Sequence, residues 1–171
     1  MHGGEFKAVY CYPVEHYGYW RAQLPGRALT MGNFGENFTV EGFSENSVYI
    51  GDKFSVGSAE VMVTQPRLPC FKLGIRFDMD DMVKRFLASG LSGFYLSVIR
   101  EGEVAAGDEI QVLSRDPQKV AVSDITRLYI EKRFSSADVD LLHRALTVEA
   151  LPESWKEYFR ERLENAGASV S

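Results

Sequence analysis

A cysteine placed between prolines and cations is the residue of this sequence best suited to do chemistry. Cys70 lies in residues 65–72, which read QPRLPCFK. Cations close to a thiol, here Arg67 and Lys72, favour the thiolate, which is the form that ligates metals or attacks electrophiles. The sequence therefore indicates a reactive or metal-bound cysteine. The alternative is a free, buried cysteine that packs as a small hydrophobe.

Two glycine-containing segments could bring the backbone close to a bound group. The first is His2-Gly3-Gly4 and the second is Gly35-Glu36-Asn37. Glycine permits backbone conformations that other residues avoid, and the second segment also offers N–H donors and an amide to a polar ligand. Plain turns are the alternative in both places. Neither segment matches a Walker loop or a dinucleotide fingerprint, so ATP and NAD are not indicated.

The elements that would position these residues are short strands separated by turns, up to about residue 113. Strands are predicted at residues 7–12, 38–41, 47–56, 59–64, 93–100 and 108–113. Helices are predicted at residues 14–24 and 78–90. The prolines at positions 66 and 69 must end the strand 59–64, so Cys70 is expected on a stiff loop at a strand end.

The remainder of the sequence carries a helical pattern. Residues 115–119 are polar and contain a proline, which marks a boundary. After it, Ser135 or Ser136 is placed to cap a second helix and Pro152 to open a third. The predicted fold is mainly β with helices (α+β). It consists of a barrel-like β domain at residues 1–115 and a small C-terminal three-helix domain at residues 120–166.

Composition excludes several classes of function. The chain has 171 residues, is 45% hydrophobic and 25% charged, and has a net charge of −5, so it is expected to bind neither nucleic acid nor an anionic membrane. Two cysteines are too few for the four-cysteine sites of iron–sulfur clusters or structural zinc. Cys11 is expected to be structural. The sequence shows no signal peptide, and we expect a reducing cytoplasm.

Four segments, in this order and spacing, resemble the MOSC domain family, which is named for the C-terminal domain of molybdenum cofactor sulfurases. They are HGG at residues 2–4 with KAVY and YP at 7–13, GENFTVEG at 35–42, IGD at 50–52, and QPRLPCFK at 65–72. The resemblance covers roughly residues 2–113. From about Val122 the sequence resembles the three-helix extension of a bacterial branch of stand-alone proteins linked to tolerance of N-hydroxylated purines.

The resemblance implies a molybdenum cofactor (molybdopterin) with Cys70 as metal ligand and catalytic residue. One soft thiolate for the metal and several cations for the pterin phosphate are the groups such a cofactor needs. The implied cofactor-binding residues are His2, Lys7, Gly35, Glu36, Asn37, Gln65, Arg67 and Lys72. The implied activity is the reduction of small N-hydroxylated compounds of the hydroxylaminopurine type. A separate reductase is expected to donate electrons, because the sequence has no motif for flavin, haem or iron–sulfur binding.

Two other functions and one structural expectation accompany this interpretation. Cys70 could instead carry sulfur as a persulfide, or the chain could be an inactive, truncated binding module. In the MOSC family the HGG segment is preceded by several strands, whereas here it begins at residue 2. The resemblance therefore implies an N-terminally incomplete barrel with an open edge, through which two copies could pair as a homodimer.

Overall fold

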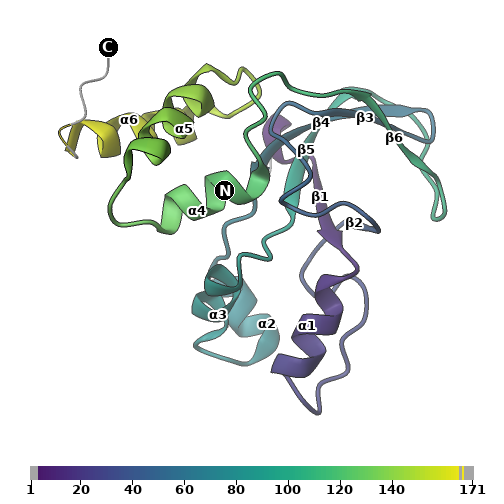
Figure 1. Cartoon of the computed structure of the whole chain (residues 1–171). Helices are drawn as coiled ribbons and strands as arrows, with labels where there is room; N and C mark the ends of the chain where they lie inside the picture. Colours follow the sequence, from purple (N-terminus) through teal and green to yellow (C-terminus); the bar gives the residue numbers. More distant parts are fainter. Residues whose placement is uncertain (1–3, 166, 168–171) are drawn as a thin grey trace.

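The computed structural model describes residues 4–165 and 167 and has the expected α+β fold, with six strands in one sheet and six α-helices in that part of the chain (Figure 1). His2 lies outside the described residues. The elements in chain order are the 3₁₀ turn η1 (Glu5–Lys7), β1 (Val9–Pro13), α1 (His16–Gln23), β2 (Phe38–Val40), β3 (Lys53–Val56), β4 (Ala59–Pro66), α2 (Phe71–Phe77), α3 (Met82–Ser89), β5 (Phe94–Arg100), β6 (Ile110–Ser114), α4 (Val122–Ile130), α5 (Ser136–Thr147) and α6 (Glu153–Asn165).

The strands form a curled half-barrel in the order β2-β1-β5-β4-β3-β6. β1 and β2 are parallel, and the other neighbouring pairs are antiparallel. The pairing of β4 with β5 shifts register twice, and that of β3 with β6 shifts once. Such irregularities bend strands and increase their twist, which accounts for the curl of the sheet.

The strand predicted at residues 47–56 is wrong in its first half, because β3 begins only at Lys53. Residues 47–52 form turns in which Gly51 has a φ of 93°, a conformation that favours glycine. The buried carboxylate of Asp52 accepts a hydrogen bond from the Tyr49 N–H at 2.9 Å. It also accepts one from Arg115 at 2.5 Å, so the turn is tied to the segment after β6.

The helix predicted at residues 78–90 is wrong in its first turn, and the structure has a separate helix, α2, before it. Asp78, the first residue of the predicted helix, ends α2 instead, with a left-handed φ of 45°. Its N–H donates to the carbonyls of α2, and Asp81 then occupies the N-cap position of α3. Cys70 is the N-cap residue of α2, so it stands where the proline-containing loop meets a helix.

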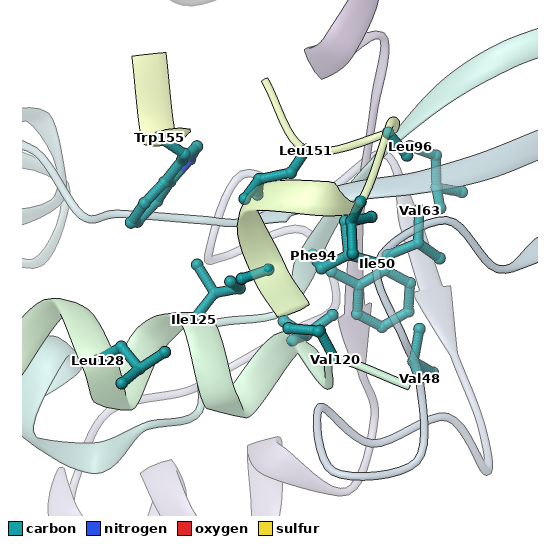
Figure 2. Packing of buried hydrophobic residues seen from close by; sticks show 14 of the residues in the cluster. Val48, Ile50, Val63, Phe94, Leu96, Val120, Ile125, Leu128, Leu151 and Trp155 are labelled. Atoms are coloured by element: carbon teal, nitrogen blue, oxygen red, sulfur yellow. The ribbon is translucent and has the colours of Figure 1, made fainter. Parts of the chain in front are cut away.

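Two separate cores hold the molecule together. The larger one packs strand residues against the C-terminal helices, and Figure 2 shows side chains of the sheet such as Val63 and Phe94 together with Ile125, Leu128 and Leu151. The smaller core is rich in aromatic rings from β1, α1, α3 and the loop before β2. Its members include Tyr12, Trp20, Phe34 and Phe86. In Figure 1, α1, α2 and α3 accordingly gather apart from α4, α5 and α6.

The C-terminal helices follow the sequence prediction closely. Ser135 caps α5, with its hydroxyl accepting the Asp138 N–H at 3.2 Å, and Pro152 immediately precedes α6. Phe159 and Leu163 of α6 are fully buried. Within residues 4–165 and 167, none of the helices has the length and apolar character needed to cross a membrane.

Candidate functional site

Cys70 opens into a cavity of about 520 Å³ between the sheet, α2 and the loop before β2. The positively charged side chains of its wall are Lys7, Arg67, Lys72 and Arg76. In the part of the chain that the structure describes, no carboxylate lines this cavity, and none of the four cations forms an ion pair. We call it the cation-lined cavity. Its volume lies within the range of small-molecule and cofactor sites.

The two cysteines have very different surroundings. Cys70 is a free, half-buried thiol on the cavity wall. Cys11 is 2% exposed in the larger core, where burial raises the pKa of its thiol and keeps it protonated. The expectation that Cys11 is structural therefore agrees with its position, and Cys70 is the thiol that a ligand in the cavity can reach.

Arg67 is fixed at the cavity wall by two aromatic rings and two hydrogen bonds. The group lies 4.8 Å from the ring centroid of Tyr10 and 5.3 Å from that of Phe86. Its Nη1 donates to the carbonyl oxygen of Phe34 at 2.6 Å and to the Tyr10 hydroxyl at 3.3 Å. Arg67 thus holds the loop before β2 in place while its positive charge remains on the cavity wall.

The Gly35-Glu36-Asn37 segment divides between the cavity and the interior. Gly35, with a φ of 85°, and Asn37 both line the cavity. Asn37 is paired to β1, since its side-chain oxygen accepts the Tyr10 N–H at 2.9 Å. Glu36 does not line the cavity. Its carboxylate accepts the N–H groups of Gly32 at 2.8 Å and Phe34 at 3.2 Å, so it shapes the loop from within.

Gln65 lies at a second, adjacent cavity rather than at the cation-lined one. It is 5% exposed, and its side-chain oxygen accepts the indole N–H of Trp155 in α6 at 2.9 Å. The second cavity, of about 310 Å³, is lined by Lys7, Gln65, Pro66, Leu68, Tyr95, Tyr129, Ser154, Trp155 and Tyr158. We call it the aromatic cavity. It shares Lys7, Leu68 and Tyr95 with the cation-lined cavity, so the two cavities adjoin, and we call them together the groove.

The lining residues that are absent from the sequence-predicted set include Arg76 and Tyr95. Arg76 lies one helical turn after Lys72 on α2, and this spacing would have identified it if α2 had been predicted. Tyr95 lines both cavities, its ring centroid lies 5.8 Å from the Lys7 ammonium, and burial raises the pKa of its hydroxyl. No local motif marks Tyr95, because its place depends on the pairing of β5 with β1 and β4.

The chain belongs to the MOSC domain family. The family model described as MOSC domain matches residues 1–111. A second model, described as YiiM-like, 3-alpha helix domain, matches residues 122–166. Together they cover the cation-lined cavity and all of the described C-terminal helices.

Relatives with sequence similarity include two bacterial proteins and one fungal protein. The chain is 39% identical to the uncharacterized protein YflK of Bacillus subtilis, over 94% of this chain and 71% of the relative. It is 36% identical to protein YiiM of Escherichia coli, over 95% and 71%. It is 32% identical to a protein named Reductase from Gibberella moniliformis, over 96% of this chain but only 29% of that longer protein.

Solved structures of the same family share the fold. The crystal structure of YiiM from Geobacillus stearothermophilus has a TM-score of 0.87 and 37% identity, covering 94% of this chain and 80% of that one. The crystal structure of YiiM from Escherichia coli has a TM-score of 0.86 and 33% identity, covering 97% and 82%. These structures support the α+β fold and the half-barrel.

Family membership supports a MOSC-type molybdenum-cofactor-binding function, and the groups in the cavity fit such a cofactor. A soft thiol suits molybdenum, and an anionic phosphate suits cations that are not neutralised by carboxylates. Cys70 supplies the thiol, and the four cations listed above line the same cavity.

Proposed function

We propose that this protein binds the molybdenum cofactor through Cys70 and reduces N-hydroxylated compounds of the hydroxylaminopurine type. The observation that carries the proposal is the half-buried Cys70 thiol on a cavity whose four cations have no carboxylate partner among the described residues. The relative named Reductase supports an oxidoreductase role.

Five residues of the cavity have a part in binding. Cys70 holds the metal, and Arg67, Lys72 and Arg76 hold the phosphate of the pterin. Asn37 lines the same cavity and presents its side-chain NH₂ group to the pterin, while its side-chain oxygen accepts the Tyr10 N–H. When bound, the cofactor supplies the two-electron reduction of an N–O bond, and the protein supplies ligation and orientation.

The overall reaction consumes two electrons and two protons. It converts R–NHOH to R–NH₂ and water as the N–O bond breaks. Lys7 and Tyr95 are the two proton-bearing side chains on the wall shared by both cavities, so we assign proton delivery to them. The two electrons come from a separate reductase, which we propose as the protein partner of this chain.

The test is elemental analysis of the protein purified from a host that makes the cofactor. We expect stoichiometric molybdenum in the wild-type protein and in Cys11→Ser, and none in Cys70→Ser. The wild-type protein should then reduce 6-hydroxylaminopurine with a chemical electron donor. Molybdenum retained by Cys70→Ser would contradict the ligand assignment, and a persulfide on Cys70 without molybdenum would indicate a sulfur carrier instead.

A further inference from the structure

We propose that the aromatic cavity is the subsite for the planar ring of the substrate, a flat heteroaromatic base. This inference rests on the proposed function. It adds the place where the base binds and the side chains that contact it. It gives the C-terminal helices a direct part in substrate binding, because Tyr129 comes from α4 and Trp155 and Tyr158 come from α6.

The rings of this cavity suit a flat aromatic ligand. Tyr129 lies 5.3 Å from Tyr158 and 5.6 Å from Trp155, measured between ring centroids. Tyr95 of β5 lines the same cavity. Aromatic side chains bind nucleic-acid bases by stacking, and this interaction tolerates different bases because every base has a π face.

The aromatic side chains are held in position before any ligand binds. Gln65 fixes the Trp155 indole through the 2.9 Å hydrogen bond described above. Arg162 of α6 donates to the carbonyl oxygens of Leu128 at 3.0 Å and Tyr129 at 3.4 Å, which ties α6 to the end of α4. Side chains that need no reordering lose little entropy on binding, so the site is preorganised.

The shared wall determines which way the ligand points. Lys7, Leu68 and Tyr95 line both cavities, whereas Cys70 lines only the cation-lined one. A base stacked in the aromatic cavity therefore directs an exocyclic group past Lys7 and Tyr95 toward the cavity that holds Cys70. An N-hydroxylamino substituent of a purine is such a group, and the ring itself stays among the aromatic side chains.

The experiment uses adenine, which has the ring of 6-hydroxylaminopurine but no N–O bond to reduce. Its binding to the molybdenum-loaded, full-length protein is measured by calorimetry for the wild type, Tyr129→Leu and Tyr158→Leu. We expect each substitution to weaken adenine binding by about tenfold, on the basis of the usual contribution of one stacked ring. Tyr19→Leu removes a 42%-exposed ring on α1 and should leave the affinity unchanged.

Other outcomes would overturn the subsite without touching the proposed function. Equal affinity in the wild type and in both cavity variants would place the base elsewhere. Adenine binding only to cofactor-free Cys70→Ser would mean that the pterin itself fills the aromatic cavity. Melting temperatures and molybdenum content of every variant show whether it is folded and loaded. If Tyr129→Leu does not fold, Tyr158→Leu and quenching of Trp155 emission by adenine in the wild type test the same point.

Discussion

The two halves of the groove are built in different ways. The cation-lined cavity is assembled from segments that carry the family motifs, and hydrogen bonds to backbone groups hold it, as between Arg67 and the Phe34 carbonyl. The aromatic cavity is assembled by packing, since Gln65 and Tyr95 come from the sheet while Tyr129 and Trp155 come from α4 and α6. One cavity of the groove therefore depends on local sequence motifs, whereas the other depends on contacts between elements that are distant in the sequence.

The largest difference is expected between the alkylation rates of the two thiols, Cys70 and Cys11. Iodoacetamide should alkylate Cys70 in the native, cofactor-free protein, whereas Cys11 should react only after unfolding, because it is 2% exposed and burial raises its thiol pKa. We expect the rates to differ by about two orders of magnitude or more, by analogy with the rarity of core opening. Mass spectrometry of tryptic peptides checks this, and rapid labelling of Cys11 would show that the larger core is loose.

Packing between sheet and helices should matter most for stability. Leu142 of α5 is fully buried in the larger core, so Leu142→Ala should lower the free energy of unfolding by about 2–5 kcal/mol. Leu113→Ala, at a residue of β6 that is 50% exposed, should change it by less than about 0.5 kcal/mol. Urea unfolding followed by circular dichroism measures both. Similar losses would mean that the C-terminal helices contribute little to the core.

The cation-lined cavity should be sensitive to the geometry of Arg67 as well as to its charge. Arg67→Lys keeps the charge but loses the planar group near the Tyr10 and Phe86 rings and the hydrogen bond to the Phe34 carbonyl. We expect a loss of about 1–3 kcal/mol in stability, together with reduced molybdenum content. Lys72→Met removes an exposed cation on the same wall and is the control for stability. Equal unfolding free energies for the two variants would show that the hydrogen bonds of Arg67 contribute nothing.

The smallest loss of stability is expected at the cap of α5, a helix that packs against α4 and α6. The Ser135 hydroxyl and N–H, and then Arg127, lower the pKa of Asp138 to about 2 from an ordinary 3.8. The charged form is therefore the stabilising one, and its contribution is complete above pH 4 and falls as the pH decreases toward 2. Asp138→Asn should cost about 1 kcal/mol at pH 7.

The pH dependence distinguishes this cap from a simple loss of packing. The difference between the wild type and Asp138→Asn should shrink as the pH falls from about 4 to about 2, when measured by urea unfolding at each pH. Asp140→Asn changes an exposed carboxylate on the same helix and should show no such trend. A difference that stays constant with pH would contradict the role of the ionised cap.

Several elements were predictable because their signals are local. The pattern of small and apolar residues predicted β4 and β5 within two residues of their ends, and Ser135 as a helix cap. The boundaries failed where a side chain far away decides the backbone. Residues 47–52 turn instead of continuing β3 because Asp52 is tied to Arg115 and to Tyr49. Asp78 ends one helix rather than beginning another because Leu73 and Phe77 bury α2 in the smaller core.

Motif spacing was sufficient to identify the family and Cys70 as the candidate ligand, because both depend on short segments. The predicted residues Lys7, Gly35, Asn37, Arg67 and Lys72 line the same cavity as Cys70, and their roles there stay a prediction. Motif spacing could not separate Glu36 and Gln65 from that set. Glu36 turns inward to bind backbone N–H groups, and Gln65 faces Trp155, ninety residues further along the chain. Whether a polar side chain points at a ligand or at the protein itself depends on which distant groups meet it. For that reason the aromatic cavity could not be predicted from the sequence, because it depends on how the sheet packs against the C-terminal helices.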